Sequence, residues 1–227
     1  MHEDARDAAR VTFSLNEIEG LSKRAARGAG YSWGLSEEAG KAVRWLNAHG
    51  VAGAEALVAL LTMKDDAPNS LNAPAQLDGT WRAACDGVLC PLISGAALND
   101  FADQMTQDHP VRMTNVAYPV LVVPFAAWAA LHIGRYVVVS WQDVQMATDG
   151  YGLWINDPAD QASDAQADAL TCAVSSSEKH FLKAPALRGV VTPPAWDSLH
   201  RFAHRTYAPA TEASRLRGAG AGTSDND

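Results

Sequence analysis

Apolar residues recur at helical spacing through the first quarter of the chain. Ser14 and Glu17 form a capping box, in which the side chain of each residue accepts a backbone N–H that the helix itself leaves unpaired. Leucine, isoleucine and alanine then follow at intervals of three and four residues as far as Gly28. The same pattern indicates two more helices, so we expect a helical lobe over residues 11–64, with helices at residues 14–28, 36–49 and 54–63.

The pattern changes after residue 64. Residues 64–80 are rich in Asp, Pro, Asn, Ser and Gly without apolar periodicity, which predicts a loop. Short β-branched or aromatic runs bounded by turn residues, such as Asp149-Gly150, then indicate a sheet-rich body over residues 85–192. We expect strands at residues 88–90, 111–116, 120–123, 136–141, 153–155 and 170–175, and helices at residues 96–105 and 126–132. Helices segregated from a mostly antiparallel sheet define an α+β fold.

The end of the chain is typical of a helix followed by a tail. Pro193-Pro194 suits a helix start, and apolar residues at helical spacing continue it over residues 193–207. Residues 208–227 are Gly-rich towards their end, a composition typical of a flexible tail. We expect residues 1–227 to fold as a single domain.

Charge and hydropathy narrow the class of protein. Lys and Arg number 18 and Asp and Glu number 26, a formal net charge of −8, which excludes nucleic-acid binding through a broadly basic surface. The longest apolar stretch, residues 117–131, holds two prolines and falls short of the roughly 20 residues of a membrane-spanning helix. The odd number of cysteines indicates thiols rather than disulfides, and the charged start has no apolar run behind it, so we expect a cytoplasmic protein.

The last helix carries a candidate metal site. Asp197, His200 and His204 are spaced three and four residues apart, which places them on one helix face. Two imidazoles and a carboxylate are ligands for Zn²⁺ or Fe²⁺, and the same groups could act as acids or bases. The alternative is that these are ordinary surface histidines beside an apolar stripe. A further ligand would come from another histidine, with His109, His132 and His180 as candidates.

Two cysteines and two glutamates are further candidates for chemistry. Cys85 and Cys90 lie near an expected strand, where a thiol with a depressed pKa and a neighbouring base would be a nucleophile. The alternative for Cys90 is a small buried apolar residue. Glu37 and Glu38 supply carboxylates at the start of the second helix.

Residues 30–34 match the G-x-S-x-G pattern of a nucleophile elbow, in which Ser32 would be the nucleophile. An elbow requires a strand before the turn, and here a helix precedes it, so we expect a Gly-rich turn between helices with Trp33 packed in the core. Residues 157–168 carry four aspartates whose spacing lacks the pattern of a calcium loop, which favours a solvated acidic connection.

Several segments carry a resemblance to known sequences, namely residues 14–19, 33–40, 45–46, 90–100 and 218–227. In these segments the chain resembles a family of uncharacterised proteobacterial proteins that is known as a domain of unknown function. The resemblance implies no activity, cofactor or catalytic residue. It does imply that the Gly-rich ending is a feature of the family, in which case Asp225 and Asp227 could dock into a cleft or a neighbouring subunit.

These features support two hypotheses of different classes. The first is an enzyme that acts on a small polar metabolite by acid/base chemistry of the hydrolase or lyase type, in a cleft between the helical lobe and the sheet. The second is a non-catalytic accessory subunit or small-molecule-binding protein that works with a partner, either a second copy of the chain or another subunit. The seven tryptophans, a residue that often lines pockets and interfaces, fit both hypotheses.

Overall fold

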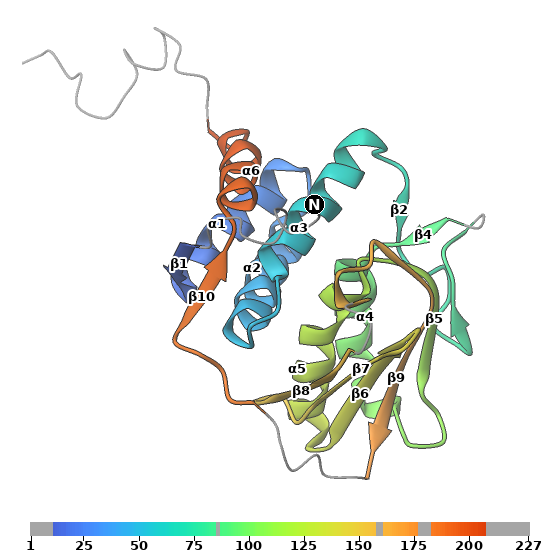
Figure 1. The fold of residues 1–227 in the computed structure, drawn as a ribbon. Coiled ribbons are helices and arrows are strands. Elements are labelled where there is room, and N and C mark those ends of the chain that lie inside the picture. The colour runs from blue at the N-terminus through green and yellow to red at the C-terminus, as the bar shows by residue number, and fades with distance from the viewer. Residues whose placement is uncertain (1–10, 85–86, 158–160, 177–182, 208–227) are drawn as a thin grey trace, which may run out of the picture.

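A computed structural model of the chain describes residues 11–84, 87–157, 161–176 and 183–207. Four of the described helices gather on one side of the molecule, and the sheet lies on the other side with two helices packed against it, which confirms the α+β fold (Figure 1). The two parts are called the helical lobe and the sheet body below.

The helical lobe begins much as the sequence predicts. The capping box of Ser14 and Glu17 is formed in both directions, with Ser14 N donating to Glu17 Oε2 over 2.9 Å. The second helix starts earlier than expected because Ser32 caps it, its hydroxyl oxygen accepting from Leu35 N. The elements are β1 (Val11–Ser14), α1 (Leu15–Gly28), α2 (Trp33–Ala48) and α3 (Gly53–Asp66).

The end of the described chain returns to this lobe. Strand β10 (Arg188–Val191) pairs antiparallel with β1, and helix α6 (Pro193–His204) contacts α1 and α3 (Figure 1). A Cβ at Gly189 would lie 2.6 Å from Cδ1 of Ile18 and 2.9 Å from Cβ of Asn47, so a larger residue here would force both neighbours to shift. The sequence patterns do not predict β10, and the helical lobe therefore includes residues far beyond residue 64.

The sheet body contains eight described strands in the order β2-β4-β5-β9-β6-β7-β8, with β3 also pairing with β5. The pairs among β2, β3, β4 and β5 are parallel, and those among β5, β9, β6, β7 and β8 are antiparallel. The strands are β2 (Leu71–Asn72), β3 (Thr80–Trp81), β4 (Val88–Leu89), β5 (Val111–Ala117), β6 (Tyr136–Trp141), β7 (Val144–Thr148), β8 (Leu153–Asn156) and β9 (Gln166–Ser175).

Helices α4 (Pro91–Asp100) and α5 (Val123–Ile133) contact both the sheet and α2, and so join the two parts (Figure 1). A Cβ at Gly95 would lie 2.3 Å from the ring of Phe125, so α4 approaches α5 more closely than any larger residue permits. Short 3-10 helices complete the body: η2 (Ala102–Gln104), η3 (Pro119–Val122) and η4 (Gln161–Ser163).

Residues 120–123 form part of η3 and the start of α5, so the strand expected there is wrong. Tyr118 adopts a left-handed backbone with φ 40° and turns the chain out of β5 before Pro119. A short buried apolar run has the same composition in a strand and in a helix, which explains the error. Among the described residues, no helix combines the length and the apolar character that crossing a membrane requires.

Candidate functional site

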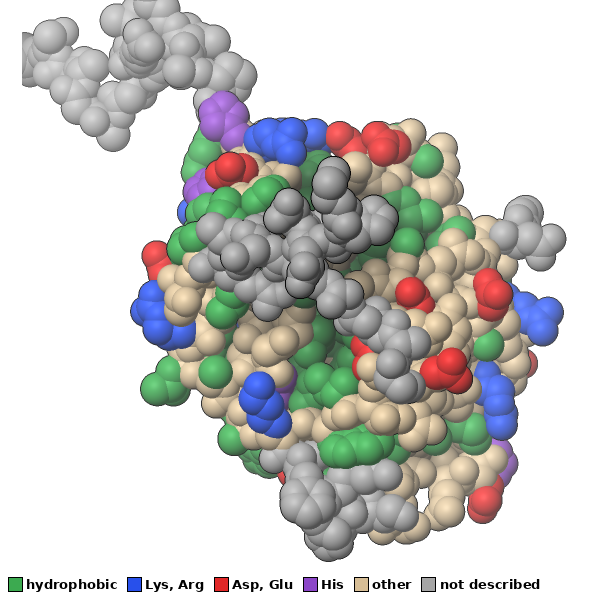
Figure 2. All heavy atoms as spheres, viewed as in Figure 1, with side chains coloured by type: hydrophobic (Ala, Val, Ile, Leu, Met, Phe, Trp, Pro, Cys, Tyr) green, Lys and Arg blue, Asp and Glu red, His purple; other side chains and the backbone are tan. Residues whose placement is uncertain are grey.

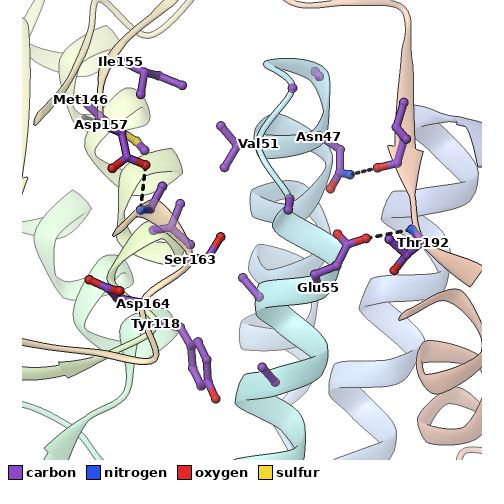
Figure 3. A pocket seen from close by; sticks show the side chains of 18 of the residues that line it. Asn47, Val51, Glu55, Tyr118, Met146, Ile155, Asp157, Ser163, Asp164 and Thr192 are labelled. Atoms are coloured by element: carbon purple, nitrogen blue, oxygen red, sulfur yellow. Dashed lines mark hydrogen bonds between the residues drawn. The ribbon is translucent and has the colours of Figure 1, made fainter. Parts of the chain in front are cut away.

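A cleft of about 820 Å³ lies between the helical lobe and the sheet body. Residues of α2 and α3 line one wall, residues around β8 and η4 line the other, and the segment that leads into β10 lies along it (Figure 3). Figure 2 shows the hollow between the two parts, with hydrophobic side chains along it and acidic side chains on the sheet side. The cleft lies where the sequence analysis expects one.

Glu55 is the carboxylate of the helical wall. It stands in the first turn of α3, and its Oε1 accepts a hydrogen bond of 2.8 Å from the backbone N–H of Thr192. The other oxygen, Oε2, is buried and has no hydrogen-bond partner among the described residues. A buried carboxylate oxygen without a partner is costly, by about 1–3 kcal/mol or more, and is therefore a group that a ligand can stabilise.

Asn47 holds the same wall in place. Its Nδ2 donates to Val190 O over 2.8 Å, and its Oδ1 accepts from Ala54 N over 3.1 Å. Because Asn47 is only 3% exposed, both groups need these partners. Asn47 therefore fixes the position of α2 relative to both α3 and β10.

Asp157 is the matching carboxylate of the sheet wall. Its Oδ1 accepts from Gln161 N over 2.7 Å and its Oδ2 from Ala162 N over 2.9 Å, so both oxygens cap η4 (Figure 3). Asp164 is half-buried on the same wall. Residues 161–163 form η4, which leads into β9, and Asp160 lies outside the described residues.

Tyr118 also lines the cleft. Its left-handed backbone is rare for a residue other than glycine and stores about 1–3 kcal/mol of strain, which neighbouring contacts must hold. One of these is the hydrogen bond of 2.8 Å from Tyr118 N to Ala165 O. Partial burial raises the pKa of the Tyr118 hydroxyl, so at neutral pH it is a hydrogen-bond donor.

Two cations, Lys183 and Arg188, lie before β10 and at its first position. The backbone of Lys183 pairs with Leu153, while its side chain is exposed and forms no hydrogen bond or ion pair with the described residues. A Cβ at Gly50 would lie 3.3 Å from Lys183 Nζ, which places the ammonium at the end of α2. Arg188 uses Nη2 to donate to Thr12 O over 3.2 Å. Both residues line the cleft.

A second pocket, of about 520 Å³, adjoins the cleft at Ala48 and Ala186, which line both. Trp45, Trp128, Tyr151 and Leu187 supply much of its apolar surface. His49 at its base is 3% exposed, with Nδ1 2.8 Å from Trp45 O and Nε2 3.0 Å from Tyr151 O. His49 therefore connects α2 of the helical lobe to the turn between β7 and β8.

The histidines selected from the sequence lie away from the cleft. Asp197, His200 and His204 are exposed on α6, where His200 packs edge-on against Trp196 and His204 against Tyr207. The described residues contain no group of three or more His, Cys, Asp or Glu side chains that could hold a metal ion. The structure thus does not bring the predicted metal ligands together. Of the further candidates, His109 contacts Thr106, His132 contacts Asp103 and His180 lies outside the described residues.

Cys90 is fully buried before α4, with Sγ 3.3 Å from the hydroxyl oxygen of Tyr31. Burial raises the pKa of the Cys90 thiol, which keeps it protonated and argues against the nucleophile interpretation. Burial also raises the pKa of Cys172 to about 12. Both are free thiols, as predicted, and Cys85 lies outside the described residues.

Glu37 and Glu38 form ion pairs on the surface of α2. Glu37 Oε1 lies 2.6 Å from Lys23 Nζ, and this hydrogen bond lowers the pKa of the Glu37 carboxyl. Glu38 Oε1 lies 3.0 Å from Lys41 Nζ. Neither carboxylate lines the cleft.

The G-x-S-x-G segment is a turn between two helices, as expected. Ser32 caps α2, and the chain before it is α1 rather than a strand. Trp33 is 64% exposed, so the prediction that it packs in the core is wrong. The Arg27 guanidinium lies 4.9 Å from the centre of the Trp33 ring and makes a cation–π contact with it at the surface.

Glu55 and Tyr118 are absent from the candidates that the sequence suggests. A glutamate in the first turn of a helix is common because it complements the helix dipole, so Glu55 carries no special signal. The only sequence signal at Tyr118 is the proline that follows it, because a residue before proline disfavours the right-handed helical backbone.

Known proteins resemble parts of the chain. Residues 13–85 match the family described as "Protein of unknown function (DUF3726)", which confirms the resemblance to a family of unknown function and supplies no activity. No curated protein matches the chain. A solved structure, malate dehydrogenase from Entamoeba histolytica, is similar over 73% of this chain with 12% sequence identity and a TM-score of 0.43. The chain spans 49% of that protein, and a likeness this weak carries no argument about activity.

Proposed function

We propose that the protein binds a small polar metabolite in the cleft between its two parts and acts on it through acid/base chemistry by Glu55. The observation that carries this proposal is the buried Oε2 of Glu55, which has no partner among the described residues. A volume of about 820 Å³ falls within the range of small-molecule sites, and the wall combines apolar residues with a few polar groups, as such sites do.

The chemistry follows from the two walls. The Glu55 carboxylate can accept a proton from an O–H, N–H or activated C–H of the ligand. Tyr118 lines the same cleft and offers a neutral hydroxyl that can donate a hydrogen bond to an oxygen of the ligand that gains charge. Proton removal with stabilisation of a developing negative charge is the chemistry of a lyase or a hydrolase.

The test is turnover in a metabolite extract. The full chain is incubated with the extract, and mass spectrometry follows which species are consumed and formed. We expect wild type to convert at least one species and Glu55→Gln to convert it at least about 100-fold more slowly, the usual range for loss of a general acid or base. Glu38→Gln is the control, because Glu38 pairs with Lys41 outside the cleft. Equal rates in wild type and Glu55→Gln contradict the proposal.

A non-catalytic accessory or binding role is the second candidate, favoured by the surface beside the cleft. Tyr151 is 73% exposed and Leu187 is 91% exposed, and both line the second pocket. Exposed apolar side chains around a pocket are typical of partner contacts. Under this alternative the chain retains a ligand in native mass spectra and converts nothing, and Leu187→Ser abolishes a homo-oligomer or a complex with another subunit.

A further inference from the structure

We infer that the ligand of the cleft is a zwitterion, a metabolite of amino-acid to dipeptide size that carries an ammonium group, an acidic group and an apolar side chain. This inference rests on the proposed function, because it names the substrate class of the same site. Three features of the cleft carry it: a carboxylate that needs a donor, two cations on one edge, and an apolar surface.

The carboxylate end of the cleft favours a cationic donor. Glu55 Oε2 is buried and unpartnered, and an acceptor in that position is best satisfied by a charged N–H donor. Asp164, half-buried on the facing wall, adds a second negative charge, whereas both oxygens of Asp157 are occupied by backbone N–H groups. An ammonium group has three N–H donors and can serve more than one acceptor, which a hydroxyl group cannot.

The positive charges of the cleft, Lys183 and Arg188, lie close together in the chain. Lys183 has no hydrogen bond or ion pair with the described residues. Arg188 donates one of its five N–H groups to Thr12 O, and, beside the hydrogen bonds from Ser14, its charge helps to lower the pKa of the Glu17 carboxyl. Both residues line the cleft and both are exposed. A carboxylate or phosphate on the ligand can accept from them, and salt should weaken this part of the interaction because the cations are exposed.

Apolar side chains complete the lining. Figure 3 shows Met146 and Ile155 on the sheet wall and Val51 on the helical wall. These residues can bury the hydrocarbon part of a ligand, at about 25 cal/mol per Å² of apolar surface. A cleft lined only for a small sugar or a dicarboxylate would not need this surface.

Matched probes separate the contributions of the two charges. Isothermal titration calorimetry of the full chain uses leucine and leucyl-leucine as zwitterions, isoamylamine as leucine without its carboxylate, and 4-methylvalerate as leucine without its ammonium. We expect at least one zwitterion to bind roughly tenfold or more tightly than either singly charged probe, the effect of one charge-assisted hydrogen bond.

Variants assign each charge to its partner. Glu55→Gln should weaken leucine and isoamylamine roughly tenfold and leave 4-methylvalerate unchanged, because the amide keeps the size of the side chain and removes its charge. Lys183→Gln should weaken leucine and 4-methylvalerate roughly tenfold and leave isoamylamine unchanged, because it removes the cation that the carboxylate would contact. Lys23→Gln, which removes a cation that lines neither the cleft nor the second pocket, should leave all four affinities unchanged. Circular dichroism of each variant checks that the fold is intact.

The outcomes separate this inference from the proposed function. If 4-methylvalerate or isoamylamine binds as tightly as both zwitterions, or if none of the four probes binds, the zwitterion inference is overturned. The proposed function fails separately, when wild type converts no species of the metabolite extract. Binding of the zwitterions with equal affinity to wild type and Glu55→Gln also overturns the inference.

Discussion

The two walls of the cleft are fixed by contacts of very different range along the chain. On the helical wall, Asn47 and Glu55 bind backbone groups of Val190 and Thr192, which lie 143 and 137 positions further on. On the sheet wall, Asp157 binds backbone N–H groups only four and five positions further on. The helical wall therefore depends on the return of the chain through β10 and α6, whereas η4 on the sheet wall is capped by a residue close to it in the chain.

The two walls also differ in how their carboxylates, Asp157 and Glu55, use their oxygens. Both oxygens of Asp157 accept hydrogen bonds from the backbone, so its carboxylate stabilises the start of η4. Glu55 uses one oxygen to hold the backbone at Thr192 and leaves the other unpartnered among the described residues. Asp157 is therefore a structural residue, and Glu55 has capacity for a ligand.

The largest effect is expected where α6 packs on the helical lobe. Leu199 is fully buried, and Leu199→Ala should lower the free energy of unfolding by about 2–5 kcal/mol, through lost burial and the cavity left behind. Urea titration measures this change. His200→Ala, on the exposed face of the same helix, is the control and should change stability by less than about 0.5 kcal/mol. A loss below about 1 kcal/mol for Leu199→Ala would show that the helical wall does not depend on α6.

A smaller effect is expected on the sheet wall. Asp157→Ala removes two charge-assisted hydrogen bonds and should lower the free energy of unfolding by about 2 kcal/mol. Glu55→Gln keeps an oxygen for Thr192 N and should lower it by less than about 1 kcal/mol. Denaturation midpoints of the two variants, measured side by side, check the difference. Equal losses would mean that both carboxylates serve the fold alone.

The smallest effect is expected at the ion pair between α3 and α6. Arg205 Nη1 and Nη2 lie 2.7 and 2.8 Å from the two carboxylate oxygens of Asp65, and this hydrogen bonding lowers the pKa of Asp65. The stabilisation is therefore present above the ordinary value of 3.8 and is lost as the pH falls through the lowered pKa. The pair is exposed, so Asp65→Asn, which leaves the contact of Arg205 with the Phe202 ring in place, should lower the melting temperature slightly at neutral pH and not at all well below pH 3.8. A melting-temperature difference that persists in acid would contradict this assignment.

Local signals make the helices of the N-terminal part predictable from sequence. The capping box at Ser14 and the end of α1 at Gly28 both involve residues close together in the chain. Strand β10 is not predictable in this way, because it is short, contains Gly189 and pairs with residues at the other end of the described chain. The strand expected at residues 120–123 fails for another reason, since the backbone of Tyr118 decides the direction of the chain there.

The candidate site is less predictable than the fold. Its location between helices and sheet follows from the change in hydrophobic pattern, whereas the residues in it do not. Glu55 differs from Glu37 and Glu38 only through its burial beside Thr192, a contact between distant parts of the chain. Spacing on one helix selects Asp197, His200 and His204, yet spacing does not say whether a helix face meets another element or solvent.

The return of α6 to α1 sets the order in which a newly made chain can complete its fold. Helix α1 leaves the ribosome well before β10 and α6, yet it packs against both of them. Until then its apolar face lacks this cover, a condition in which nascent chains associate with chaperones or with one another. A translation product that stops before Pro193 lacks α6 and therefore leaves part of the apolar face of α1 uncovered.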